Sequence, residues 1–175
     1  MKTLVVNLFA GPGAGKTTCA WEIASELKKR GIVTEYVPEY AKELVWDENY
    51  EALADQESIF EEQAHRINRL VGKVDVIVTD SPILFSEIYG ENNSNDNFNL
   101  FINRGSTFEQ QGRIHNLEES KEKDNEIKQM LDEHSVYYGN YYHRTVPVII
   151  DNIVKTLHRI QAYTEQDEDD EEMEL

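Results

Sequence analysis

The feature that most limits the fold is a buried-strand pattern that leads directly into a glycine-rich loop and then a helix. Residues 3–9, "TLVVNLF", form a short apolar run rich in β-branched residues, typical of a strand covered on both faces of a parallel sheet. The loop "AGPGAG" follows, and residues 16–30 then place apolar side chains at three- and four-residue spacing. A strand followed at once by a helix begins a βαβ unit, so the pattern predicts an α/β fold.

The rest of the chain continues this alternation of strand and helix patterns. Further strands are predicted over 32–37, 74–80, 98–103 and 136–138, helices over 38–46, 56–71, 117–132 and 146–160, and loops over 92–97 and 104–113. Together these elements predict a five-stranded parallel sheet with helices on both faces. In such sheets, ligands bind outside the carboxyl ends of the strands, so residues that follow each strand are the candidates for a site.

Composition divides the chain into one domain, 1–163, and an acidic tail, 164–175. The tail carries eight acids and no base, within a chain of net charge −17, and is expected to be a solvated, disordered extension. The alternatives are an interaction tail or a nucleic-acid mimic. The acidic body argues against broad binding to a nucleic-acid backbone, although it leaves room for a local basic groove. Cys19 has no partner for an internal disulfide, which favours a reducing cytoplasm, and no apolar run is long enough to span a membrane.

The glycine loop matches a motif built to hold phosphates. Residues 10–18, "AGPGAGKTT", fit Gly-x-x-x-x-Gly-Lys-Ser/Thr, with Ala10 in place of the first glycine. Backbone amides of such a loop form an anion nest, and the following helix adds its positive N-terminal end. Lys16 is expected to reach the terminal phosphates, Thr17 to ligate Mg²⁺ and Thr18 to face the α-phosphate. The predicted nucleotide-binding residues are Gly11, Pro12, Gly13, Ala14, Gly15, Lys16, Thr17 and Thr18.

Two carboxylates follow predicted strands and are candidates for chemistry. Asp80 ends the apolar run "VDVIVTD" and is expected to join Thr17 in the magnesium shell, directly or through water. Glu39 follows the second strand, where a carboxylate can accept the proton of an attacking hydroxyl. The alternatives are a turn-capping role for Asp80 and, for Glu39, an acid stabilised by a helix dipole.

Two arginines flank the segment "GSTFEQQG" after the fourth strand. Arg104 and Arg113, together with the charged helix that follows, predict a mobile lid over about 104–132. Its arginines would neutralise the charge that develops on a transferring phosphoryl group. The alternative is a pair of solvated arginines. The tyrosine-rich segment 137–142 either stacks on a base or packs on the surface.

These segments resemble the small P-loop kinases of the ribosylnicotinamide kinase-like and thymidylate kinase-like group. The matching segments are "NLFAGPGAGKTT", "PEYAKELV", "VIVTDSP" and "FINRGSTFEQQGR" with the helix after it. The resemblance implies a P-loop kinase fold with bound ATP and Mg²⁺, an acceptor base at Glu39, and phosphate-clasping arginines at Arg104 and Arg113. The family often has Lys-Pro-Tyr after the first lid arginine; here 106–108 is Ser-Thr-Phe, so one cationic contact is missing.

The sequence therefore predicts an ATP-dependent kinase in which Lys16, Glu39, Asp80, Arg104 and Arg113 act together. The expected acceptor is a hydroxyl of a nucleoside, a nucleotide or a modified base. The style of the sequence also resembles phage kinases that phosphorylate 5-hydroxymethyluracil in DNA, which would place the protein in a host cytoplasm with DNA as a substrate and no membrane partner. The alternative is a regulatory nucleotide-binding ATPase or switch without a small-molecule acceptor.

Overall fold

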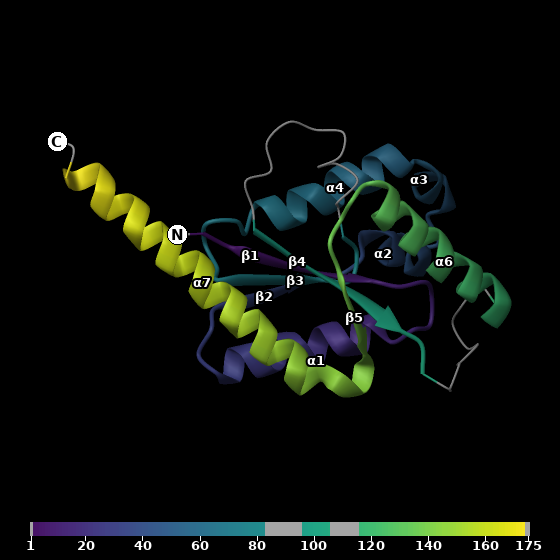
Figure 1. The fold of residues 1–175 in the computed structure, drawn as a ribbon. Coiled ribbons are helices and arrows are strands. Elements are labelled where there is room, and N and C mark those ends of the chain that lie inside the picture. The colour runs from purple at the N-terminus through teal and green to yellow at the C-terminus, as the bar shows by residue number, and fades with distance from the viewer. Residues whose placement is uncertain (1, 83–95, 106–115, 174–175) are drawn as a thin grey trace.

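The computed structural model describes residues 2–82, 96–105 and 116–173, and their side chains except those of His143 and 164–173. The chain alternates between strands and helices along most of this length (Figure 1). The strands are β1 (Leu4–Phe9), β2 (Thr34–Val37), β3 (Val76–Thr79), β4 (Asp96–Asn103) and β5 (Gly139–Tyr142). The helices are α1 (Lys16–Lys29), α2 (Tyr40–Trp46), α3 (Tyr50–Ala54), α4 (Gln56–Asn68), α6 (Leu117–Glu133), the 3₁₀ turn η1 (His143–Thr145) and α7 (Val146–Met173).

The strands form one parallel sheet in the order β2-β3-β1-β4-β5. Strand β1 is central, with Leu4 opposite Val76 of β3 on one side and Asp96 of β4 on the other. The predicted five-stranded parallel sheet is therefore confirmed. All its carboxyl ends point to the same edge, and the glycine loop leaves β1 at that edge.

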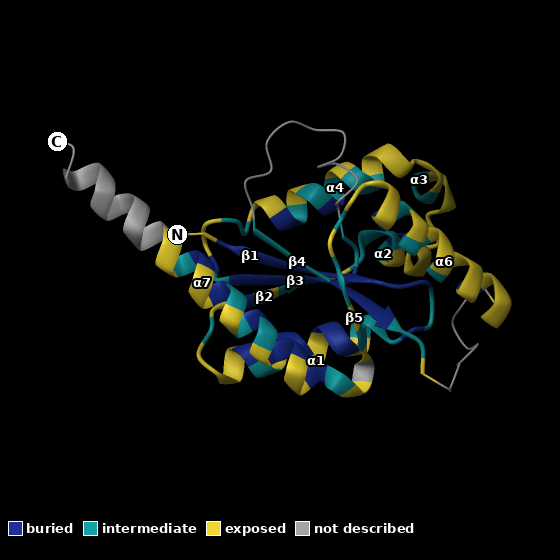
Figure 2. Ribbon diagram, in the orientation of Figure 1, coloured by how far each residue is buried: buried dark blue, intermediate teal, exposed yellow. Residues whose placement is uncertain are grey.

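Helices cover both faces of the sheet, which explains why the strands read as continuous apolar runs. Leu4, Val6 and Leu8 of β1 pack in one cluster with α1 and α7. Val5 and Phe9, which alternate with them, face the opposite side, where α4 and α6 pack. Figure 2 shows the resulting layers, with β1 and β3 buried between helices that are exposed on their outer sides.

Strand β4 begins two residues earlier than the sequence predicts. Residues 92–97 were expected to be a loop because of their asparagines, but Asp96 and Asn97 are part of the strand. Their polar side chains are tolerated because the buried Asn7 of β1 donates hydrogen bonds to Asn97 and Asn99 Oδ1, both at 2.9 Å. Tertiary pairing therefore overrides the local turn signal here.

The predicted fifth strand at 136–138 is wrong, because the pairing with β4 starts at Gly139. Val136 and Tyr138 instead pack beneath α6 against Phe9 and Phe101, and this position keeps them out of the sheet. The structure also contains α3, a short helix that the sequence pattern does not predict.

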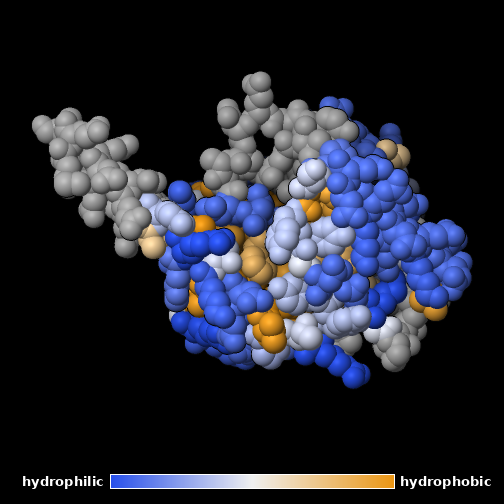
Figure 3. Space-filling view, viewed as in Figure 1, coloured by the Kyte–Doolittle hydropathy of each residue, from blue (hydrophilic) through white to orange (hydrophobic). Residues whose placement is uncertain are grey.

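The last helix, expected over 146–160, continues to Met173, so its backbone runs through most of the residues expected to be a disordered tail. The boundary of the domain at residue 163 stays a prediction. No helix among the described residues is long and apolar enough to cross a membrane. The surface over α6 is almost continuously hydrophilic (Figure 3), as its charged sequence predicts.

Candidate active site

The loop between β1 and α1 has the backbone shape of an anion nest. Gly13 and Gly15 have positive φ angles of 79° and 93°, which glycine adopts without strain. Lys16 folds back over the loop, and its Nζ donates to the Ala10 carbonyl at 2.8 Å. The first amides of α1 have no intrahelical acceptor and are free to bind an anion at the helix N-terminus.

Gly11 is required for a different reason, which the sequence did not reveal. A Cβ built on Gly11 would lie 2.6 Å from the Ser120 carbonyl oxygen and 2.9 Å from atoms of both Arg104 and Asp124. The Gly11 amide also donates to Asp124 Oδ1 at 2.6 Å. Gly11 therefore makes room for helix α6 against the loop, and its own amide is already engaged by protein.

Asp80 lies directly beyond β3 and joins two elements through its carboxylate. The Thr17 hydroxyl donates to Oδ2 at 2.5 Å, and the Tyr36 hydroxyl donates to Oδ1 at 2.9 Å. Asp80 is only 4% exposed. Burial, reinforced by Asp80, raises the pKa of Tyr36, so Tyr36 stays a donor at all ordinary pH values.

Thr17 and Asp80 present the kind of oxygen donors that Mg²⁺ uses. Magnesium keeps several waters and takes one or two protein oxygens together with phosphate oxygens, so a hydroxyl and a carboxylate in contact fit it. The described residues contain no group of three or more acidic, histidine or cysteine side chains that could hold a metal ion by themselves. Thr17 and Asp80 are thus in direct contact, whereas their predicted role in holding metal stays a prediction.

Glu39 stands at the junction of β2 and α2, where it is the N-cap residue of α2 but makes no capping hydrogen bond. Burial raises the pKa of its carboxyl, opposed by the Lys16 charge and reinforced by Asp80. Its carboxylate is therefore within electrostatic reach of both the P-loop lysine and the β3 acid. A carboxylate that is not used as a cap is available for other chemistry.

Lys16 is the cation that these acids share. Burial lowers its pKa, while Glu39, then Asp80, then Asp124 oppose that effect. Of the three carboxylates, Glu39 has the largest influence on Lys16. The structure thus brings Lys16, Glu39 and Asp80 together at one edge of the sheet, although 64 residues separate the first from the last in the chain.

Arg104 follows β4 and is held between the loop and α6. Its Nε donates to Asp124 Oδ2 at 2.5 Å, Nη1 to the Pro12 carbonyl at 2.6 Å and Nη2 to the Ser120 carbonyl at 2.8 Å. The Arg104 and Asp124 side chains are 12% and 13% exposed. Arg104 therefore fastens α6 to the loop, whereas the sequence predicts an arginine on a moving lid.

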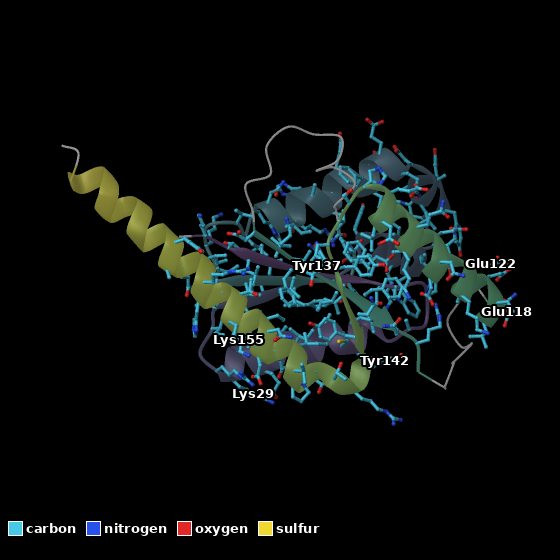
Figure 4. All side chains as sticks on the ribbon, viewed as in Figure 1. Lys29, Glu118, Glu122, Tyr137, Tyr142 and Lys155 are labelled. Carbon is cyan, nitrogen blue, oxygen red and sulfur yellow. The ribbon has the colours of Figure 1, made fainter. Side chains whose placement is uncertain are left out.

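Arg113, the second arginine of the expected lid, lies outside the described residues. The described part is Arg104, Gly105 and 116–132, most of it helix α6, whose Glu118 and Glu122 point outward (Figure 4). Tyr142 ends β5 at the same edge of the sheet as the loop, while Tyr137 is 91% exposed at the start of that segment. A role of these tyrosines in holding a base stays a prediction.

Three side chains of this region did not emerge as site residues from the sequence. Asp124 is one acid among many on a charged helix, and nothing local distinguishes it. Tyr36 sits inside a short strand, and only its place near the carboxyl end gives a signal. Gln63 lies on a helix whose sequence pattern is simply amphipathic, and its side chain bonds to the backbone on both sides of Glu39.

No family model matches the sequence, and no curated protein matches it either. Among solved structures, the chain is similar to the deoxyadenosine kinase of M. mycoides with bound dATP, at 16% identity and a TM-score of 0.58, over 88% of this chain and 99% of that one. It is also similar to the shikimate kinase of Aquifex aeolicus vf5, at 15% identity and a TM-score of 0.50, over 88% and 96% of the two chains. The five-stranded parallel sheet with helices on both faces is the P-loop kinase fold of these two structures.

Proposed function

We propose that this protein is an ATP-dependent phosphotransferase that moves the γ-phosphoryl group of ATP to a hydroxyl of a nucleoside, a nucleotide or a modified base. The observation that carries the proposal is the convergence of Lys16, Glu39 and Asp80 around the end of the glycine loop. A binding switch needs the loop and the metal acid. The uncapped and partly buried Glu39 is the group that a kinase needs in addition.

In the proposed reaction, the acceptor hydroxyl oxygen forms a bond to the γ-phosphorus while the bond to the β–γ bridging oxygen breaks. Glu39 takes the proton of the hydroxyl, and ADP leaves. The loop amides and Lys16 hold the phosphate oxygens, and Thr17 and Asp80 would hold Mg²⁺, whose charge offsets that of the phosphates. Such transfer depends mainly on positioning and charge neutralisation, which these groups supply.

For Arg104 we propose that it holds the glycine loop in place, a role that follows from its contacts. Three of its N–H groups already donate to protein oxygens, so it holds the Pro12 end of the loop and adds positive charge beside Lys16. The expected clasp on phosphate is proposed for Arg113.

The nucleoside class of acceptor is supported by the similarity to a deoxyadenosine kinase, while the similarity to a shikimate kinase supports a small alcohol. Radiolabelled ATP offered with a panel of nucleosides, nucleotides, ribosylnicotinamide, shikimate and DNA that contains 5-hydroxymethyluracil separates these classes. We expect label to move to a nucleoside-type hydroxyl. Release of inorganic phosphate alone, with no labelled acceptor, would contradict the proposal.

The variant Glu39→Gln separates a kinase from a regulatory switch. We expect turnover to fall about a hundredfold or more, the usual range for loss of a general base, with ATP affinity unchanged. Glu35→Gln is the matched control, because Glu35 is exposed on β2, the strand just before Glu39, and pairs with Lys28 at the surface. Equal turnover in Glu39→Gln and the wild type would favour the switch.

If DNA is the acceptor, binding should weaken steeply as salt rises, because phosphate contacts release counterions. A Kd for hydroxymethylated DNA that stays flat between low and moderate salt would limit the acceptor to small molecules.

A further inference from the structure

Gln63 lies in the middle of α4 and is only 3% exposed. Its Oε1 accepts a hydrogen bond from the Tyr40 amide at 2.9 Å, and its Nε2 donates to the Pro38 carbonyl at 3.2 Å. One side-chain amide thus holds the backbone immediately before and immediately after Glu39. These contacts join segments that are more than 20 residues apart in the chain.

This clamp, the pair of hydrogen bonds from Gln63 to the Pro38 and Tyr40 backbone, takes the place of the capping side chain found at other helix starts. The first amides of a helix lack intrahelical acceptors, and an N-cap Ser, Thr, Asp or Asn commonly satisfies one of them. At the start of α2, the Tyr40 amide is satisfied by Gln63 while Glu39 makes no cap. The Glu39 carboxylate is therefore left free, and its place depends on the backbone that Gln63 holds.

Helix α4 is a firm support for such a clamp. Ile67, one turn after Gln63, is 1% exposed and packs with Val5, Val37 and Ile77 of the sheet. On the side toward α2, Arg66 binds Glu43 through both of its terminal nitrogens, at 2.6 and 2.9 Å, and lies 4.5 Å over the ring of Tyr40. Gln63 therefore connects the turn that carries Glu39 to a helix whose position is fixed by packing against the sheet.

We infer that Gln63 is a positioning residue, which sets the Glu39 carboxylate at the place where it meets the acceptor hydroxyl. The inference rests on the proposed function, because it states how the general base of that reaction is held in position. It also gives Gln63 a task distinct from contact with the acceptor, since its amide is engaged with the Pro38–Tyr40 backbone.

The test is Gln63→Met, which keeps the length of the side chain and removes both hydrogen bonds. We expect kcat to fall about tenfold to a hundredfold, because small displacements of a reacting group reduce rates on this scale. The Kd for ATP, measured by calorimetry, should stay within twofold of wild type, since Gln63 touches neither the loop nor Asp80 in the described structure. In a Glu39→Gln background, Gln63→Met should change kcat by less than twofold.

Thr3→Val is the matched control for general destabilisation. Thr3 is also buried, and its hydroxyl also bonds two backbone groups, donating to the Val74 carbonyl at 2.7 Å and accepting from the Gly72 amide at 2.9 Å. It precedes β1 at the edge of the sheet opposite the site. We expect Thr3→Val to reduce stability to a similar degree and to leave kcat unchanged at a temperature where both variants are folded.

Three results would overturn the inference: an unchanged kcat in Gln63→Met, an equal fall in kcat in the wild-type and Glu39→Gln backgrounds, or an equal fall in Thr3→Val. If turnover of Glu39→Gln is below detection, Gln63→Met and Thr3→Val decide the matter without it. In Gln63→Met, kcat must fall while the Kd for ATP stays near the wild-type value, and in Thr3→Val kcat must stay unchanged. Failure of the proposed function would show separately, as a wild-type protein that phosphorylates no member of the acceptor panel.

Discussion

At the scale of single residues, the site is defined by two groups whose surroundings shift their pKa values toward each other. Burial raises the pKa of Glu39 and lowers that of Lys16, and in each case the opposite charge of the partner only reduces the effect. Desolvation is therefore stronger than the attraction between the pair. A raised pKa makes the Glu39 carboxylate a better proton acceptor than an ordinary exposed Glu.

This pair predicts the pH profile of phosphoryl transfer. Glu39 accepts a proton only when ionised, so kcat/KM should rise with pH through an apparent pKa above 4.5, the ordinary value for Glu. Lys16 neutralises phosphate only when protonated, so kcat/KM should fall again through a value below 10.5. Steady-state rates across this range measure both limbs. The acid limb should disappear in Glu39→Gln, and its persistence there would assign it to another group.

At the scale of elements, the attachment of α6 to the glycine loop is the contact that shapes the site. Asp124 accepts from the Gly11 amide with one oxygen and from Arg104 with the other, and Arg104 reaches back to Pro12. The helix and the loop are thus joined through one nearly buried ion pair.

Breaking this pair should cost more than breaking an exposed pair on the same helix. Arg104→Met leaves the Asp124 carboxylate buried without its cation, and we expect the free energy of unfolding in urea to fall by about 3 kcal/mol. Lys121→Met, which removes the exposed pair with Glu118, should change it by less than about 0.5 kcal/mol. Similar values for the two variants would show that the Arg104–Asp124 pair is effectively solvated.

At the scale of the whole molecule, the part of α7 whose side chains are described, 146–163, contributes one face to the core. Its buried side chains are Val146, Ile149, Ile150, Ile153, Leu157 and Ile160. In Figure 1 the helix then extends past the sheet toward the C-terminus. The stability of the domain should therefore depend on the residues up to Ile160.

A chain that ends at Tyr163 tests this division. We expect its free energy of unfolding to lie within about 0.5 kcal/mol of the full chain, as for surface changes generally. Leu157→Ala, which opens a cavity between α7 and the sheet, should lower it by about 3 kcal/mol. Both values come from urea denaturation. A large loss on truncation would place residues 164–175 in the folded domain.

The sequence by itself determined the features that depend on local pattern. Runs of apolar residues marked most of the strands, spacing marked most of the helices, and their alternation placed Lys16, Glu39 and Asp80 at one edge of a parallel sheet. This works because the carboxyl ends of parallel strands must meet, whatever the side-chain details.

Only the tertiary structure decided which polar groups meet. In the structure the fifth strand begins at Gly139, and Gly11 contacts α6. Arg104 pairs with Asp124, and Gln63 bonds to the backbone next to Glu39. These partners lie from 20 to more than 100 residues apart in the chain, and each side chain alone is compatible with many surroundings. Local periodicity encodes which way a side chain faces. The choice of its partner depends on the packing of whole helices against the sheet, which no short segment contains.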